Sequence, residues 1–244
     1  MGRLDNKVAI ITGAARGMGE AHARKFIKEG AKVVITDLNE ELGNALVADL
    51  GDNAIFIKQD VTSEADWTRV MTEAEQAFGA VHILVNNAGI SVSKSILQMS
   101  VEEYQKIINI NQVSVFLGMK TVQPLMAKSG GGSIINISSI NGLVGGAIGY
   151  TDSKFAVRGM TKSIALEFAQ YGIRVNSVHP GVIETPMVTE GDAVEQIRAF
   201  AKTIPLQRMA QSEEVSNMVL FLASDEASYS TGSEFVIDGG LTAR

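Results

Sequence analysis

Cysteine is absent from this chain of 244 residues, and histidine and proline are scarce. Without cysteine the protein can form neither a disulfide nor a thiolate metal site. Its three histidines, His22, His82 and His179, lie too far apart in the sequence to show a metal-ligand spacing. The four prolines form no linker, and no low-complexity stretch or internal repeat divides the chain. We therefore expect one domain that spans residues 1–244.

Long apolar runs and a net positive charge are absent as well. No apolar stretch approaches the roughly 18 residues that a membrane span needs, and the first residues lack the apolar core of a signal peptide. The formal net charge of −6 argues against nucleic acid as the main partner. Hydrophobic residues make up 45% of the chain, which is ordinary for a globular protein. We expect a soluble cytoplasmic protein without a membrane or nucleic-acid partner.

Short apolar runs alternate with helical patterns along the whole chain, as in an α/β protein. The runs are apolar at nearly every position, which is typical of strands buried on both faces of a parallel sheet. The expected strands cover 8–11, 32–36, 54–57, 81–85, 133–138, 173–178 and 234–237. The expected helices cover about 18–28, 40–49, 63–78, 101–127, 150–170 and 212–223. This alternation predicts a doubly wound parallel sheet with right-handed crossovers.

Caps and helix breakers add detail to this pattern. Ser100 followed by Glu103 is a capping-box pattern for the helix from 101, and Pro124 marks a kink or a break within that helix. Ser212 is the expected cap of the last helix. Residues 186–205 have proline at both ends and no sheet pattern, so we expect a loop with a short helix that acts as a lid.

Polar and glycine-rich stretches follow the expected strands at their carboxyl ends. They cover 12–19, 37, 60–61, 86–89, 138–139 and 179–185. In a doubly wound sheet these ends share one edge, and ligands bind there at the point where the strand order reverses. The sequence therefore predicts a ligand site built from these stretches.

The loop Thr12–Gly19 lies between the first strand and the first helix. Its glycines let the backbone pass close to a pyrophosphate, whose charge the helix N-terminus favours. Asp37 ends the second strand, where a carboxylate accepts hydrogen bonds from a ribose 2′-hydroxyl and repels a 2′-phosphate. This predicts NAD rather than NADP. Arg16 is the counterargument because it can face a phosphate, and Asp37 can alternatively cap the next helix, a task for which Asn39 is equally suited.

Tyr150 and Lys154 are four residues apart, so in a helix they lie on one face. A cation beside a phenol lowers the tyrosine pKa from its usual value of about 10. Such a tyrosine can exchange a proton with an alcohol or a carbonyl oxygen near neutral pH. The same spacing also arises by chance, in a solvated lysine beside a half-buried tyrosine. The other motifs of the chain must decide between a catalytic pair and a chance pair.

Seven motifs stand in register along the chain. In order they are Thr12–Gly19, Asp60 with Val61, Asn86–Gly89, Asn111, Ser138 with Ser139, Tyr150 with Lys154, and Pro180-Gly181 with Thr185. On these motifs the chain resembles the short-chain dehydrogenase/reductase family over essentially its whole length. The resemblance implies an α/β, single-domain, doubly wound Rossmann fold with a seven-stranded parallel sheet flanked by helices.

The resemblance also implies catalytic roles. Tyr150 is the implied proton donor to a carbonyl, or the base towards an alcohol, and Ser139 rather than Ser138 hydrogen-bonds the substrate oxygen. Lys154 is implied to lower the pKa of Tyr150 and to hold the nicotinamide ribose. Asn111 is implied to kink its helix and to hold a water that links Lys154 to solvent, with a buried asparagine that satisfies helix carbonyls as the alternative. His179 is expected to be a packed loop residue.

The implied cofactor is NAD(H), and no metal is expected. Asp60 and Val61 should bracket the adenine, Asn87 and Gly89 should lie along the ribose, and Thr185 should meet the nicotinamide together with Ile183. The full set of expected cofactor residues is Gly13, Arg16, Gly17, Met18, Gly19, Asp37, Leu38, Asp60, Val61, Asn87, Ala88, Gly89, Tyr150, Lys154, Pro180, Gly181, Ile183 and Thr185.

The loop between Ser139 and Tyr150 departs from the family pattern because it is a residue or two shorter than is common. It contains four glycines and should form one wall of the substrate site. The expected lining of that site is mostly apolar and lacks a charged anchor, which favours a neutral, lipophilic substrate. Its candidates are Ser91, Val92, Ser93, Asn141, Leu143, Val144, Ile148, Met187, Val188 and Phe200.

The leading hypothesis is an oxidoreductase that transfers hydride between NAD(H) and a secondary alcohol or ketone, with a lipophilic, cyclic or steroid-like substrate. One alternative is a 3-oxoacyl-carrier-protein reductase, against which Asp37 and the negative net charge argue; another is a polyol dehydrogenase. A non-catalytic NAD-binding regulator is disfavoured by the intact Tyr150 and its partner motifs. The resemblance also implies a homotetramer, in which the helices at 101–127 and 150–170, and the C-terminal strand-helix face, pair across twofold axes.

Overall fold

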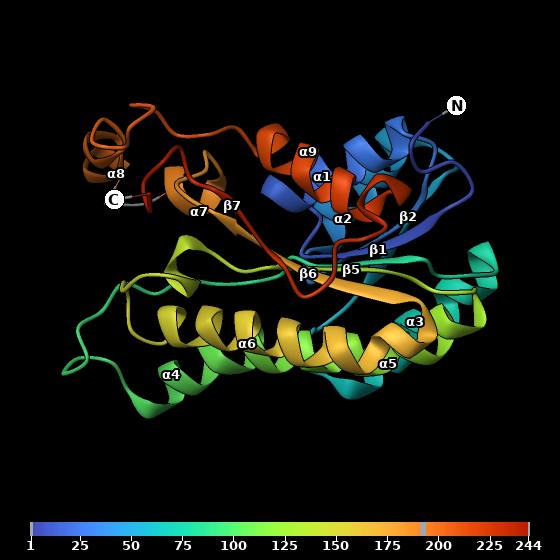
Figure 1. Ribbon diagram of the computed structural model, residues 1–244. Helices are drawn as coiled ribbons and strands as arrows, with labels where there is room; N and C mark the ends of the chain where they lie inside the picture. The colour runs from blue at the N-terminus through green and yellow to red at the C-terminus, as the bar shows by residue number, and fades with distance from the viewer. Residues whose placement is uncertain (1, 191–193, 244) are drawn as a thin grey trace.

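Seven strands form one parallel sheet with helices on both faces (Figure 1). The computed structural model describes residues 2–190 and 194–243, so both chain ends and residues 191–193 of the predicted lid lie outside the description. The strands are β1 (Val8–Thr12), β2 (Lys32–Asp37), β3 (Ala54–Lys58), β4 (Ile83–Asn86), β5 (Gly132–Ile137), β6 (Ile173–Pro180) and β7 (Glu234–Ile237). Their spatial order is β3-β2-β1-β4-β5-β6-β7, which confirms the predicted doubly wound sheet.

The helices cover the sheet in two layers, each with its own apolar core (Figure 1). One layer holds α1 (Gly17–Lys28), α2 (Glu40–Leu50) and α9 (Ser212–Ala223); the other holds α3 (Glu64–Phe78), α4 (Val101–Ile108), α5 (Ser114–Lys128) and α6 (Tyr150–Phe168). Along β1, Ala9 and Ile11 join the core of the first layer, whereas Ile10 joins that of the second. This alternation explains why the strands are apolar at every position, as a sheet covered on both faces requires.

The strand order reverses between β1 and β4, and the loops that follow these two strands touch each other. The backbone N–H groups of Asn87 and Ala88 both donate to Thr12 Oγ1 over 3.0 Å. Gly13 has a φ of +62°, and a Cβ there would lie only 2.9 Å from Ala88 Cα. Glycine is therefore required at this point, both for the left-handed conformation and for the close approach of the two loops.

The helix predicted over 101–127 is interrupted, but not at Pro124. α4 ends at Ile108, a π-helical turn covers Asn109–Val113, and α5 then continues through Pro124 to Lys128. The predicted capping box at Ser100 is confirmed, since Ser100 Oγ accepts from Glu103 N and the Glu103 carboxylate accepts from Ser100 N. The π-turn covers only five residues, so hydrophobic periodicity alone does not reveal it.

Two further local expectations differ from the structure. The stretch 186–205 contains two helices rather than one, α7 (Pro186–Thr189) and α8 (Val194–Ala201). Ser212 is the first residue of α9 instead of its cap, and the Glu214 carboxylate accepts from the backbone N–H of Gln211 over 2.8 Å. Short 3₁₀ turns cover Ile140–Gly142, Ala169–Tyr171 and Asp225–Ala227.

Candidate active site

Tyr150 and Lys154 lie on the first two turns of α6, next to the carboxyl end of β5. Gly149 precedes the helix with a φ of +79°, and its N–H donates to the Asp152 carboxylate over 2.9 Å. A Cβ at Gly149 would approach the Ile107 side chain to 3.1 Å, so glycine lets the start of α6 pack closely on α4. The local sequence thus fixes where the helix starts and which way Tyr150 faces.

Burial sets the electrostatics of this pair. Lys154 is 4% exposed, and burial lowers its pKa to about 8. Its Nζ donates to the carbonyl of Ile137 over 2.8 Å and lies 5.5 Å from the centroid of the Tyr150 ring. Burial raises the pKa of Tyr150 above its usual value, and a hydrogen bond with Ser139 opposes that rise. The expected lowering of the Tyr150 pKa by Lys154 is therefore not seen, because the ammonium lies over the ring and bonds to a backbone carbonyl.

The two adjacent serines have different hydrogen-bond partners. Ser138 Oγ donates to the Lys154 carbonyl over 3.0 Å, so it is used to hold α6 against β5. Ser139 is hydrogen-bonded to Tyr150, and its Oγ also accepts from Asn141 N over 3.1 Å. Of the two hydroxyls, Ser139 is the one placed beside the phenol, as the family pattern implies.

Asn111 lies inside the π-helical turn and is completely buried. Its Oδ1 accepts from Ile90 N over 2.8 Å, and its Nδ2 donates to Ile90 O over 2.9 Å and to Ser153 Oγ over 3.2 Å. Gly89 lies beside it, since a Cβ there would be 3.3 Å from Asn111 Oδ1 and 3.6 Å from Lys154 Nζ. Asn111 therefore binds the loop after β4 rather than helix carbonyls, which removes the alternative considered for it.

Asp37 is the last residue of β2, and both of its carboxylate oxygens accept hydrogen bonds. Oδ2 accepts from Ala15 N of the glycine loop over 3.1 Å, and Oδ1 accepts from Asn39 N over 3.0 Å. The side chain of Asn39, not that of Asp37, caps α2. Arg16 is exposed and forms an ion pair with Glu190 at 3.3 Å, so it is turned towards the predicted lid. Asp37 is thus the acidic group fixed at the end of β2.

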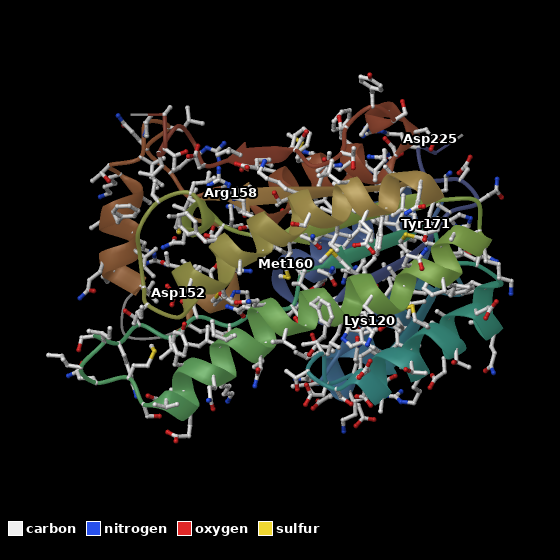
Figure 2. All side chains as sticks on the ribbon, turned by 60° about the horizontal axis from the view of Figure 1, so that its bottom comes forward. Lys120, Asp152, Arg158, Met160, Tyr171 and Asp225 are labelled. Carbon is white, nitrogen blue, oxygen red and sulfur yellow. The ribbon has the colours of Figure 1, made fainter. Side chains whose placement is uncertain are left out.

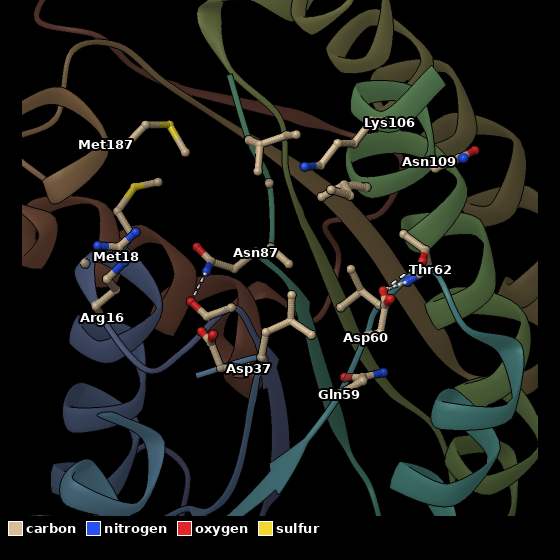
Figure 3. Close-up of a pocket in the computed structure, with 18 of the residues that line it drawn as sticks. Arg16, Met18, Asp37, Gln59, Asp60, Thr62, Asn87, Lys106, Asn109 and Met187 are labelled. Carbon is tan, nitrogen blue, oxygen red and sulfur yellow. Dashed lines mark hydrogen bonds between the residues drawn. The ribbon is translucent and has the colours of Figure 1, made fainter. Parts of the chain in front are cut away.

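A cleft of about 730 Å³ opens above the carboxyl ends of the strands (Figure 3). Figure 3 shows Arg16 and Met18 on one wall and Lys106 and Asn109 of the second helix layer on the opposite wall. Twelve of the expected cofactor residues line the cleft, namely Gly13, Arg16, Gly17, Met18, Asp37, Leu38, Asp60, Val61, Asn87, Ala88, Gly89 and Thr185. The remaining expected residues, Gly19, Tyr150, Lys154, Pro180, Gly181 and Ile183, do not line it.

The residues outside the cleft have identifiable places. Gly19 supports the glycine loop, because a Cβ there would lie 2.4 Å from the Gly13 carbonyl oxygen. Pro180 ends β6, and Gly181 N donates to Ile237 O over 2.8 Å. Ile183 is buried in the core of the first helix layer. These residues set the shape of the loops around the cleft.

Sequence reasoning missed one wall of the cleft. Four residues of α4 and the π-turn line it with the spacing of one helical face, namely Glu102, Gln105, Lys106 and Asn109; Gln59, Thr62, Ile90, Ile110 and Pro186 were also not anticipated. The spacing of three to four residues was a usable signal, since such positions share one side of a helix. It was overlooked because these side chains are polar and belong to no family motif.

The lining fits a dinucleotide. The Asn87 amide donates through Nδ2 to Thr12 O and Gly13 O, which leaves its buried Oδ1 without a partner among the described residues. A buried acceptor facing a cleft is expected where a ligand hydroxyl or amide donates to it. The N-terminus of α1 opens on the same cleft, where its N–H groups suit a pyrophosphate. Within the described residues, no cluster of acidic or histidine side chains suits a metal ion.

Close packing requires two of the four glycines in the short loop between Ser139 and Tyr150. A Cβ at Gly142 would lie 2.5 Å from Ser138 Oγ, and a Cβ at Gly146 would overlap the Asn141 amide at 1.5 Å. The Asn141 amide crosses the loop to donate to Thr151 Oγ1 over 3.3 Å. Of the ten candidate substrate residues, Met187 lines the large cleft, while Val144 and Phe200 are exposed.

Comparison with known proteins places this site in a family. A family model described as enoyl-(acyl carrier protein) reductase matches residues 13–242. The chain is 52% identical to the 3-alpha-(or 20-beta)-hydroxysteroid dehydrogenase of Mycobacterium tuberculosis, covering 99% of this chain and 92% of the relative. It is 48% identical to the cyclopentanol dehydrogenase of Comamonas testosteroni over 100% of both chains. It is 43% identical to the NADP-dependent (R)-specific alcohol dehydrogenase of Lentilactobacillus kefiri over 99% of both.

The chain belongs to the short-chain dehydrogenase/reductase family. It is an oxidoreductase that acts on CH–OH groups with a nicotinamide cofactor. The relatives include an NADP-dependent enzyme, so membership alone does not choose between NAD and NADP. In the part of the chain that the structure describes, no helix is long and apolar enough to cross a membrane.

Proposed function

We propose that this protein is an NAD-preferring dehydrogenase of secondary alcohols, and reductase of the matching ketones, with lipophilic cyclic or steroid-like substrates. The observation that carries the reaction is the group formed by Tyr150, Ser139 and Lys154, of which Lys154 lies beside Gly89 of the cleft lining. The substrate class rests on the mostly apolar candidate lining and on relatives named for hydroxysteroids and cyclopentanol. The bound nicotinamide supplies or accepts the hydride.

In this proposal the chain itself handles the proton. Tyr150 donates its phenolic proton to the carbonyl oxygen of a ketone, or takes the proton of an alcohol in the reverse direction. Ser139 donates a hydrogen bond to the same oxygen and stabilises its developing charge. Lys154, beside the Tyr150 ring, would hold the ribose hydroxyls of the cofactor. Asn111 braces this group through the loop at Ile90, and in this proposal it also holds a water that links Lys154 to solvent.

The preference for NAD rests on Asp37. Its carboxylate is fixed by Ala15 N and Asn39 N at the rim of the cleft, where it would accept hydrogen bonds from the adenosine ribose. A negative charge held at that place disfavours the 2′-phosphate of NADP. Arg16, the group that would attract such a phosphate, is paired with Glu190.

The remaining parts of the proposal concern the surroundings of the site. The stretch 186–205 acts as a lid, supported by Pro186 and Met187 in the cleft lining and by the Arg16–Glu190 ion pair. We infer a homotetramer from the exposed apolar side chains on α5 and α6. A cytoplasmic location is in keeping with a chain that has no cysteine.

A single experiment tests the reaction and its proton donor. Purified protein is assayed with NADH and NAD on cyclopentanone, 3- and 20-ketosteroids, linear ketones, acetoacetyl thioesters, polyols and the matching alcohols. Tyr150→Phe should lose about 100- to 10,000-fold in kcat, the usual contribution of a general acid–base residue. Tyr171→Phe, on an exposed tyrosine of the turn that follows α6, is the matched control and should keep full activity.

The outcomes separate the alternatives. Full activity of Tyr150→Phe contradicts the assignment of the proton donor. A preference for acetoacetyl thioesters or polyols contradicts the proposed substrate class. The absence of turnover on the whole panel, with NADH still bound, favours a cofactor-binding regulator.

A further inference from the structure

His179 lies at the carboxyl end of β6, completely buried beneath the loop that carries Ser139. Its Nδ1 is 2.9 Å from the carbonyl oxygen of Ser139, and its Nε2 is 2.9 Å from Ser177 Oγ. A carbonyl oxygen can only accept a hydrogen bond, so Nδ1 must carry a proton. In the neutral ring Nε2 then accepts from the Ser177 hydroxyl, which fixes the tautomer.

The carbonyl of Ser139 is held from two sides. His179 donates to it from the sheet, and Gly142 N donates to it over 2.9 Å from the 3₁₀ turn that follows. Regular pairing between β5 and β6 ends with Ile137 opposite Val178, and Ser138 N still bonds to Val178 O. At Ser139 the strand ladder has ended, so the His179 side chain takes over the task of tying this peptide to β6.

We propose that His179 is a positioning residue, which holds the Ser139 carbonyl through Nδ1–H and so aims the Ser139 hydroxyl at Tyr150 and at the substrate oxygen. This inference rests on the proposed function, because it assigns a role to His179 only through Ser139. His179 is packed, as the sequence predicts, but it lies in β6 and not in a loop.

Burial is the main cause that lowers the pKa of His179, and Arg158 and Lys154 on α6 act in the same direction. The hydrogen bond to the Ser139 carbonyl and the charge of Glu234 on β7 act against them. The Glu234 carboxylate is itself neutralised by ion pairs with Arg158 at 2.8 Å and Lys162 at 2.7 Å. The Nδ1–H donor is therefore present on both sides of neutral pH.

Loss of the Nδ1–H donor of His179 should shift the pH profile of kcat/KM, which general damage to the fold would not do. The hydrogen bond from Ser139 lowers the pKa of Tyr150. When Ser139 moves away, that bond weakens and the Tyr150 pKa rises. For alcohol oxidation Tyr150 must accept a proton, so kcat/KM increases with pH through the Tyr150 pKa. The rising limb of this profile should shift to higher pH.

The test compares His179→Leu, His179→Asn and His179→Gln in the full-length protein. Asn places its amide near the Nδ1 position and can donate to Ser139, whereas Gln places its amide near the Nε2 position and cannot. We expect His179→Leu and His179→Gln to lose about 10- to 100-fold in kcat, the cost of a misplaced catalytic group. Their rising limb should move to higher pH, as in Ser139→Ala. NADH affinity should be unchanged, and His179→Asn should retain both the rate and the profile.

Three controls make the outcome decisive. His82→Leu removes a histidine at the opposite end of the sheet, where it accepts from Val8 N, and should leave the limb in place. If His179→Leu does not fold, the comparison of His179→Asn with His179→Gln still decides, and equal behaviour of these two overturns the inference. The inference is also overturned if the rising limb of the pH profile stays in place in His179→Gln while Ser139→Ala and Tyr150→Phe lose activity. In that case the proposed function remains intact. Full activity of Tyr150→Phe instead contradicts the proposed function.

Discussion

Ser138 and Ser139 show how neighbouring residues of one type acquire different tasks. Both hydroxyls contact α6, but at different groups. The hydroxyl of Ser138 donates to the backbone carbonyl of Lys154, while that of Ser139 meets the Tyr150 phenol. The chemical identity of a serine does not decide its role; its place relative to the end of β5 does.

Asp37 offers the sharpest test at the level of a single side chain. Asp37→Ser removes the carboxylate that disfavours a 2′-phosphate, so kcat/KM with NADPH should rise. With NADH it should fall about 10-fold or more, the usual effect of losing a hydrogen bond to a charged group. Part of this loss comes from the glycine loop, because Ala15 N loses its partner. The measurement is the ratio of kcat/KM values for the two cofactors.

Asp49→Ser is the matched control for this change. Asp49 is an exposed carboxylate of α2 that pairs with Arg24, away from the cleft. The control should leave the cofactor ratio unchanged. An Asp37→Ser variant that keeps the original ratio would contradict the assignment of NAD preference to Asp37.

The contact between α1 and α9 contains an unusual residue, the completely buried His22. Ser216 Oγ donates to Ser212 O, so it must accept from His22 Nδ1–H, 2.7 Å away. The ring's Nε2 has no partner among the described residues, and a proton there would lie in an apolar contact. Burial accordingly lowers the pKa of His22 to about 3 from its usual 6.5.

This packing makes the helix pair sensitive to acid. Below pH 6.5 the unfolded chain binds a proton at His22 and the folded chain does not, so stability falls as pH falls from 6.5 towards 3. The free energy of unfolding should drop by about 1.6 kcal/mol between pH 6.5 and 5 through this group alone, given 1.36 kcal/mol per pKa unit. His22→Asn keeps a donor towards Ser216 but does not titrate. Urea unfolding at both pH values should show a smaller drop for the variant, and equal drops would contradict this account.

The elements that sequence could predict are those with a repeating signal. All seven strands and most helices were found because each β-run is buried on both faces and each helix has one apolar side. The nucleotide cleft followed from motifs at strand ends. The π-turn at Asn109–Val113 was missed because a turn of five residues is too short for its hydrophobic period to be read. The contact between His179 and Ser139 could not be predicted, because the two residues are 40 positions apart in sequence and only the register of β5 on β6 brings them together.

At the scale of the whole molecule, the second helix layer presents an apolar surface. Figure 2 shows α5 and α6 running side by side on this face, and a groove of about 290 Å³ between them is lined by Phe116, Ile164, Tyr171 and neighbouring residues. Leu166 is 84% exposed on α6. Such exposed apolar groups on a helix pair are typical of a contact between subunits.

Leu166→Glu should therefore break the predicted tetramer into smaller species, because it puts a charge into a contact that excludes water. Light scattering after size-exclusion chromatography measures the mass. Leu42→Glu, on the exposed side of α2, is the control and should leave the mass unchanged. A wild-type mass equal to one chain would contradict the proposed assembly.

The π-turn limits which insertions and deletions the chain can tolerate. Each residue of an α-helix turns the chain by about 100°. Removing one residue between Asn109 and Val113 would rotate everything before the turn relative to α5 by that amount. Either Asn111 would leave the loop at Ile90, or the buried face of α5, where Gly118 touches Trp67, would turn out of the core. Insertions and deletions should therefore be tolerated in the loops before α4 and after α5, but not inside the π-turn. The length of this turn should stay fixed among homologous enzymes.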